Sequence, residues 1–228
     1  DFVAETLFDL SLIGIHLSRI GEEWVLWTSE EFGFARLDDA YATGSSMLPQ
    51  KKNADIAELA RGKSGRLIGN LTGLLATLKS LPLAYNRDLQ EDKEPLFDSV
   101  EQTVLALAAI AGMIETAVFD TDRMAAAADA ELLAATDLAE HLVRDGVPFR
   151  QAHAQVGQLV RRHVAGEANL RELAVAEIGP DCAAYFEPGG ATQMRTSPGG
   201  AGPSPVAVQI EMFSTRLRDS LARLEQLG

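Results

Sequence analysis

Hydrophobic residues recur every three or four positions along most of the chain, which is the period of an α-helix. The first such stretch covers residues 3–27 and is apolar on more than one face, as in a helix buried inside a bundle. Gly21 is a candidate break within it. Two further stretches cover residues 55–78 and 97–114, and no strand-like alternation lies between them. The pattern therefore predicts three long helices of an up-and-down bundle.

Four glycines fall on one side of the second predicted helix, at spacings of three and four: Gly62, Gly65, Gly69 and Gly73. Each glycine inside a helix costs about 1 kcal/mol against alanine. Such a row predicts the close approach of another helix, from this chain or from another subunit. Simple tolerance within a crowded core is the alternative.

From about residue 119 the periodic stretches become shorter. Thr136 and Asp137 are candidate caps for a helix that stops at Gly146. Ser204 followed by Pro205 is typical of the cap and first residue of a final helix. We therefore expect residues 1–118 to form a central helical-bundle domain and residues 119–228 a small helical C-terminal domain.

Composition excludes several classes of function. The formal net charge of −13 argues against nucleic-acid binding, which requires a basic face. No span approaches the roughly 20 uninterrupted apolar residues of a membrane helix. The single cysteine, Cys182, forms no internal disulfide and fits a reducing cytoplasm, and the four histidines lack metal-ligand spacing. We expect no metal, no nucleic acid, no membrane and a cytoplasmic location.

The chemistry concentrates in residues 44–55, which read GSSMLPQKKNAD. Two hydroxyls, a carboxamide, an asparagine and two ammonium groups directly precede the second predicted helix. Free backbone N–H groups and the positive end of the helix dipole favour anions at such a terminus. Lys51 and Lys52 add positive charge. The segment therefore predicts a receptor for carboxylates with a hydroxyl beside it.

The same segment resembles the signature loop of the fumarase/aspartase superfamily, in the version found in argininosuccinate lyases, where Gln-Lys-Lys-Asn follows the paired serines. The match continues through residues 83–93, LAYNRDLQEDK, and more weakly at Gly199-Gly200. Met47-Leu48 reverses the usual order, and Ala54 replaces a proline that pre-sets the helix start. The resemblance implies an all-α fold, a long-helix bundle of the fumarase/aspartase type followed by a small helical C-terminal domain.

The resemblance also implies an activity, the β-elimination of argininosuccinate to arginine and fumarate in arginine biosynthesis. It implies no cofactor and a homotetramer whose active sites are shared between subunits. By position in the motifs, the general base is Ser45, its catalytic partner is Lys51, and the substrate-binding residues are Asn53, Tyr85, Gln90 and Lys93. The general-acid histidine of the family lies on an upstream segment. We therefore expect this chain to be the C-terminal half of a longer enzyme, and inactive by itself.

Two other interpretations stay open at this stage. One is another fumarate-releasing lyase of the superfamily, similar to adenylosuccinate lyase; Gln50 argues against it, because those enzymes usually carry His-Lys after the proline. The other is an inactive, crystallin-like structural paralogue. Without the family motifs, the serine pair would be interpreted as a hinge and residues 86–94 as a solvated charged surface.

Overall fold

The computed structural model describes residues 1–44, 47 and 52–226. The chain divides into two compact units, residues 1–121 and 122–228. Each unit is described by itself below.

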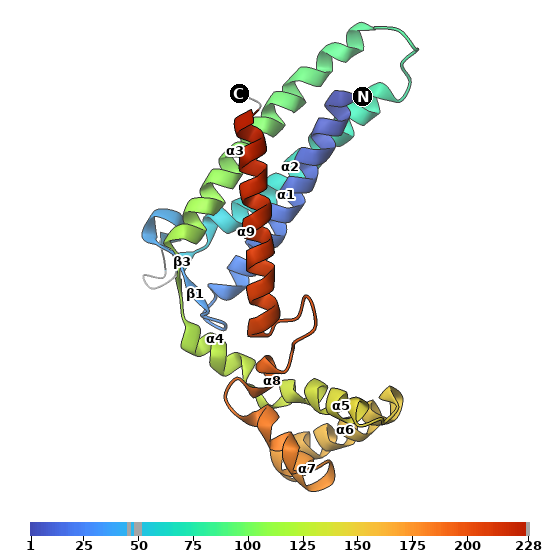
Figure 1. Ribbon diagram of the computed structural model, residues 1–228. Helices are drawn as coiled ribbons and strands as arrows, with labels where there is room; N and C mark the ends of the chain where they lie inside the picture. Colours follow the sequence, from blue (N-terminus) through green and yellow to red (C-terminus); the bar gives the residue numbers. More distant parts are fainter. Residues whose placement is uncertain (45–46, 48–51, 227–228) are drawn as a thin grey trace. The chain divides into compact units, whose positions relative to one another are not determined.

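Three long helices build the first unit: α1 (Phe2–Trp27), α2 (Asp55–Leu78) and α3 (Lys93–Thr116). They lie side by side, with α1 packed along α2 and α3 packed against both (Figure 1). The predicted all-α bundle is therefore confirmed, and α2 has the bounds that the hydrophobic pattern gave. Short elements connect the helices: β1 (Ala35–Arg36), η1 (Asp39–Tyr41), β2 (Thr43–Gly44), β3 (Lys52–Asn53), η2 (Arg87–Asp92) and β4 (Val118–Phe119).

The core of this unit lies between α1, the start of α2 and the end of α3. Its fully buried members include Ala57 and Met113, with Leu17 and Trp24 nearly as buried. The antiparallel pairing of β1 with β4 brings Phe119 to Trp24, with ring centroids 5.6 Å apart. These contacts hold the segment after α1 at the end of the bundle where α2 begins.

Gly21 is not a break, and that expectation was wrong. Helix α1 is continuous through it, and Gly21 is buried against α2. A Cβ added at Gly21 would lie 2.4 Å from the carbonyl oxygen of Ala57. The glycine is there because two helix backbones approach one another closely.

The row of glycines on α2 behaves differently. A Cβ added at Gly62, Gly65, Gly69 or Gly73 would meet nothing within 4 Å. The described part of this chain therefore does not supply the neighbouring helix that the row predicts, and another subunit stays a prediction.

The second unit is made of short helices and one long one. Its elements are α4 (Thr121–Ala128), η3 (Glu131–Leu133), α5 (Ala134–Arg144), α6 (Phe149–Val164), α7 (Leu170–Glu177), η4 (Pro180–Phe186), α8 (Gly190–Gln193) and α9 (Pro203–Gln226). Its core gathers around Leu138, Leu159, Leu170 and the thiol of Cys182. Helix α9 begins at Pro203, so Ser204 and Pro205 lie inside its first turn and are not its cap and first residue.

Asp137 is not a helix cap, and that expectation was also wrong. Helix α5 begins at Ala134, three residues earlier, and Asp137 is buried within it. Its carboxylate accepts a hydrogen bond from Arg195 at 3.0 Å. The side chain therefore serves a contact between segments far apart in sequence.

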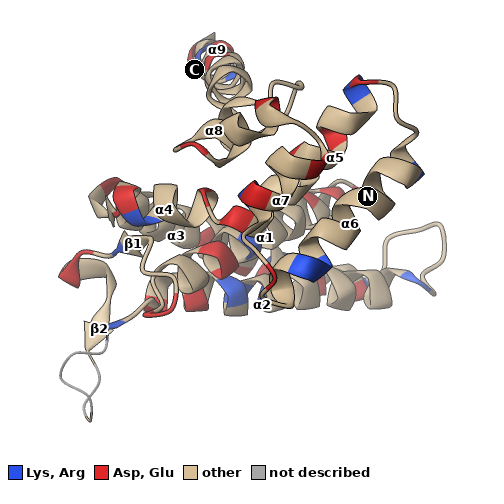
Figure 2. Cartoon of the chain, turned by 90° about the horizontal axis from the view of Figure 1, so that it is seen from below, with Lys and Arg blue, Asp and Glu red and all other residues tan. Residues whose placement is uncertain are grey.

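Acidic positions are spread over many helices and do not form one block (Figure 2). Within the described residues, one helical stretch, Arg87–Thr116, is long and apolar enough to cross a membrane by length and composition alone. It carries Asp98 and Glu101, and Asp98 accepts hydrogen bonds from α2. We therefore interpret α3 as a bundle helix, since the core helix of a bundle meets the same criterion.

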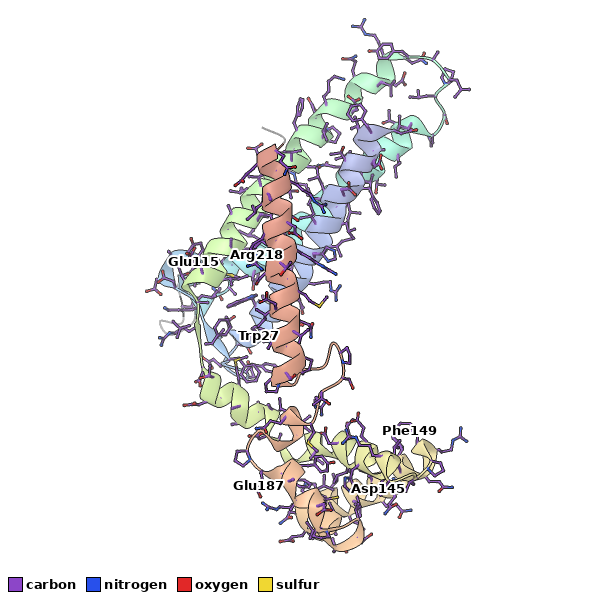
Figure 3. All side chains as sticks on the ribbon, viewed as in Figure 1. Trp27, Glu115, Asp145, Phe149, Glu187 and Arg218 are labelled. Carbon is purple, nitrogen blue, oxygen red and sulfur yellow. The ribbon has the colours of Figure 1, made fainter. Side chains whose placement is uncertain are left out.

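Among the described residues of the bundle, many large hydrophobic side chains of α1 and α3 are exposed. Side chains project outward along both helices (Figure 3). On α1 the exposed residues are Phe2, Phe8, Leu12, Ile15, Ile20 and Leu26; on α3 they are Phe97, Val100, Val104, Leu105, Leu107 and Ile114. Contiguous apolar surface of this kind marks an interaction face.

Candidate active site

The described residues on either side of the serine pair form a short antiparallel ladder. Strand β2 pairs with β3 in the register Thr43 with Asn53 and Gly44 with Lys52. Two pairs make a weak ladder by themselves, because an isolated two-stranded hairpin is marginal in water. Side-chain contacts at the base therefore matter for where this segment leaves the bundle.

Asp55, the first residue of α2, supplies such a contact. Its Oδ2 atom accepts a hydrogen bond from the backbone N–H of Thr43 at 2.9 Å and another from the Thr43 hydroxyl. Helix α2 begins at Asp55, and its N-cap residue, Ala54, makes no side-chain cap bond. The carboxylate at the start of the helix is therefore used to hold the facing strand.

Lys52 is already paired. Its ammonium group donates to Asp39 of η1, and this hydrogen bond lowers the pKa of the Asp39 carboxyl. Asp55 and Glu58 also place negative charge in the first turn of α2. Part of the positive field that the sequence predicts at this terminus is therefore balanced within the chain.

The two predicted catalytic residues, Ser45 and Lys51, lie outside the described residues. Asn53 is described: it is half-buried on β3, opposite Thr43. It also lines a hollow of about 60 Å³ with Lys52, Ala54 and residues 35–37. Ligand pockets usually measure about 300–1,000 Å³, so the described residues around Asn53 form only part of a site.

The second predicted group lies around the start of α3. Gln90, in η2, donates a hydrogen bond to the phenolic oxygen of Tyr85, and Lys93 donates to Asp92 at 2.8 Å. All three predicted residues, Tyr85, Gln90 and Lys93, are exposed. The structure thus brings Tyr85 and Gln90 together on an open surface.

The two groups are far apart within one chain. Asn53 directly precedes α2, Tyr85 follows it, and α2 contains 24 residues. At 1.5 Å per residue the helix is about 36 Å long. The chain therefore brings together residues within each group but separates the hairpin from Tyr85, Gln90 and Lys93.

Sequence analysis missed the residues that hold the hairpin base, namely Asp39, Thr43 and Asp55. The strands they join are two residues long, which is too short to give a periodic signal. The available signal was positional, because Thr43 and Asp55 flank the motif at its two ends.

Two further observations bear on other chemistry. Within residues 1–44, 47 and 52–226, no three His, Cys, Asp or Glu side chains gather as a metal site would require. An apolar hollow of about 340 Å³ between α5 and α6 contains none of the predicted site residues.

Comparison with known proteins agrees with the motifs. A family model described as argininosuccinate lyase C-terminal matches residues 132–188, and a lyase model matches residues 1–69. The chain is 56% identical to an argininosuccinate lyase of Frankia casuarinae over 217 residues, which is 92% of this chain and 47% of that protein. It is also 56% identical to an argininosuccinate lyase of Saccharopolyspora erythraea, covering 92% of this chain and 45% of the relative.

Solved structures give the same result for the fold. A structure of EDDS lyase in complex with formate is 28% identical with a TM-score of 0.86, covering 98% of this chain and 48% of that one. A fumarate lyase:delta crystallin structure from Brucella melitensis, 20% identical with a TM-score of 0.62, covers 81% of this chain and 40% of that one and shows the fold alone.

The chain spans about half the length of the curated relatives it matches. The signature loop, the second motif at residues 83–93, the helical bundle and the sequence identity all agree. Over 92% of its length, the chain is similar to about half of an argininosuccinate lyase.

Proposed function

We propose that the protein containing this chain is an argininosuccinate lyase, which splits argininosuccinate into arginine and fumarate. The observation that carries the proposal is the 56% identity to curated argininosuccinate lyases over 92% of the chain. That identity is twice the 28% found for EDDS lyase. It therefore favours argininosuccinate over another substrate of the same kind of reaction.

The reaction removes a proton from the carbon next to a carboxylate of the succinate part. The resulting aci-carboxylate then forms the carbon–carbon double bond of fumarate, while the carbon–nitrogen bond breaks and the guanidino nitrogen takes up a proton. The site must therefore supply a base, donors for the extra negative charge and an acid for the leaving nitrogen. No redox change occurs, and the reaction needs no cofactor.

Ser45 is the general base in this proposal. A serine hydroxyl is a poor base until its alkoxide is stabilised, and Lys51, which precedes α2 in sequence, is the group assigned to that task. Asn53 donates to the developing aci-carboxylate. Its position on β3, directly across the ladder from Thr43, supports a place next to the strand that leads into Ser45.

Tyr85, Gln90 and Lys93 bind the substrate in the proposal, with the Lys93 ammonium facing a carboxylate. The hydrogen bond between Gln90 and Tyr85 supports a joint role. The general acid is a histidine on the part of the relatives' length that this chain does not span.

The complete site is shared between subunits of a homotetramer. The length of α2, about 36 Å, supports this, since fully extended argininosuccinate measures only about 15 Å at about 1.2 Å per bond. One molecule cannot reach both groups of one chain along that helix. The uncovered apolar faces of α1 and α3 and the open row of glycines on α2 further support helix packing between copies. The single free cysteine, Cys182, supports a reducing, cytoplasmic location.

The test is turnover of argininosuccinate by the full-length protein, followed by the ultraviolet absorbance of fumarate. Ser45→Ala should lower kcat by at least about 100-fold, the lower range for loss of a general base, and leave substrate binding measurable. Ser220→Ala, an exposed serine on α9, is the matched control and should keep full activity. A wild-type protein that releases no fumarate from argininosuccinate, or an active Ser45→Ala variant, would contradict the proposal. Adenylosuccinate in the same assay tests the other lyase interpretation.

A further inference from the structure

A carboxylate at the start of α2 contacts the strand that precedes the serine pair in sequence. Asp55 accepts two hydrogen bonds from Thr43, one from the backbone N–H at 2.9 Å and one from the hydroxyl, across twelve positions of sequence. Hydrogen bonds to an ionised acceptor are stronger than neutral ones. The Thr43–Asp55 contact therefore links β2 to the first residue of α2 by two hydrogen bonds.

The use of Asp55 is unusual for its place in the helix. An aspartate in the first turn of a helix commonly acts through the helix dipole, by placing negative charge near the free N–H groups. The residue before it, Ala54, has no side chain that can cap, and no side-chain cap bond is made at this terminus. The start of α2 therefore has no side-chain cap, while the Asp55 carboxylate bonds to Thr43. This arrangement indicates that Asp55 has a role outside the helix.

The other contacts at the base are weaker. The β2–β3 ladder has only two residue pairs. The ion pair of Lys52 with Asp39 is exposed, with 50% and 84% of the two side chains accessible, and exposed pairs contribute little. Among the described residues, Asp55 thus ties Thr43 to the start of α2 through two hydrogen bonds from one side chain.

We propose that Asp55 is a positioning residue for the elimination reaction, acting through Thr43. By holding Thr43 from both its N–H and its hydroxyl, it fixes the strand that precedes Ser45 relative to Asn53 on β3. The proposal rests on the proposed function, because its kinetic effect requires that Ser45 is the base. Misplacement of a reacting group by about 1 Å can cost roughly 100-fold in rate, so a small shift of this strand is enough to matter.

The kinetic test uses the full-length enzyme with Asp55→Asn, Thr43→Val and Thr43→Ser. Asp55→Asn and Thr43→Val should lower kcat by about 10- to 100-fold with a smaller change in KM. Thr43→Ser keeps a hydroxyl at this position and should therefore keep most of the wild-type rate. The double variant Thr43→Val/Asp55→Asn should be no slower than Asp55→Asn alone, because the hydroxyl bond that Thr43→Val removes is one of the two that Asp55 accepts. Glu172→Gln, in the first turn of α7, removes an acidic group from a comparable helix position and should leave kcat unchanged.

A second readout does not depend on the substrate. Hydrogen exchange of a peptide covering residues 40–46 should be faster in Asp55→Asn than in wild type, while peptides from the middle of α2 keep their protection. Unchanged exchange overturns the positioning role even if the enzyme proves to use another substrate. A lower melting temperature with kcat within about 2-fold of wild type also overturns it. If wild type fails to split argininosuccinate while exchange responds as expected, the proposed function fails and the attachment at the hairpin base stands.

Discussion

The guanidinium of Arg195 lies 3.0 Å from the carboxylate of Asp137, a charged group that is buried in the second unit. Only 2% of the Asp137 side chain is accessible, against 38% for Arg195. Burial raises the pKa of the Asp137 carboxyl, and the charge and hydrogen bond of Arg195 lower it in part. The pair ties α5 to the segment after α8, where little other secondary structure forms.

Arg195→Met should destabilise the protein by about 2 kcal/mol. The loss of a partner from a fully buried ion pair costs more, but Arg195 is partly exposed, so solvent screens the interaction. The free energy of unfolding in urea measures the effect. Arg218→Met, an exposed arginine on α9, is the control and should change it little.

The same pair predicts a pH dependence. A carboxyl whose folded pKa lies above its unfolded value of about 3.9 stabilises the fold at low pH, and this contribution is lost as pH rises through the folded pKa. Arg195→Met removes a group that lowers the Asp137 pKa, so its cost should grow between about pH 4 and pH 7. Unfolding in urea across that range measures this growth. Measured in an Asp137→Asn background, where no carboxyl titrates at this position, the cost of Arg195→Met should be nearly independent of pH; an unchanged slope would contradict the assignment.

Gly21→Ala should destabilise the bundle by about 1–3 kcal/mol, the usual cost of overpacking. The new Cβ would lie 2.4 Å from the backbone oxygen of Ala57, and a backbone atom of α2 cannot move aside alone. Gly14→Ala on the same helix is the matched comparison. Its Cβ meets the Cδ1 atom of Leu67 at 2.6 Å, the far end of a flexible side chain. In thermal unfolding, the melting temperature of Gly21→Ala should lie well below that of Gly14→Ala. Equal melting temperatures would refute the close approach of α1 to α2.

Thr103→Val should stabilise the protein by about 1 kcal/mol. Thr103 on α3 is buried, and its hydroxyl has no hydrogen-bond partner among the described residues. An unpaired buried hydroxyl costs about 1–3 kcal/mol, which an isosteric methyl group avoids. Ser11→Ala is the opposite case, since the Ser11 hydroxyl bonds to the carbonyls of Leu7 and Leu67. Urea unfolding should therefore shift in opposite directions for the two variants.

Sequence reasoning succeeded where the determining interactions are local. Helix α2 has the predicted bounds, 55 to 78, because a continuous apolar stripe is followed by a proline that the helix does not reach. The expectation for Gly21 failed because its reason is the backbone of Ala57, thirty-six positions away. The expectation for Asp137 failed for the same reason, since its partner Arg195 lies 58 positions further along the sequence.

The candidate site was only partly predictable for a related reason. Tyr85 and Gln90 could be named from a motif and are joined by a hydrogen bond over five positions. The attachment of Thr43 to Asp55 could not be named, because strands of two residues carry no alternating pattern and Asp55 resembles an ordinary first-turn acid. The hydrophobic period of one chain does not identify the residues that other subunits contribute to a site.

The last prediction concerns a site divided between copies. Ser45→Ala and Lys93→Ala should each inactivate the full-length enzyme, but a refolded mixture of the two should regain activity. Ser45 precedes α2 and Lys93 follows it, so in the proposed assembly one site takes them from different chains. Random mixing leaves both residues intact in about one quarter of the sites, since each comes from the unaltered copy half of the time. The measurement is fumarate release after co-refolding, with hybrid tetramers verified by native mass spectrometry.

A matched mixture gives the control for this experiment. Ser45→Ala combined with Asn53→Ala should regain nothing, because both residues belong to one hairpin, whose base pairs Gly44 with Lys52 in a single chain. Every site then receives a hairpin with one of the two lesions. Recovery in both mixtures would mean that the hairpin is itself divided between subunits. Hybrid tetramers without activity in the Ser45/Lys93 mixture would mean that a single chain brings both ends of α2 to one substrate, which contradicts the length of that helix.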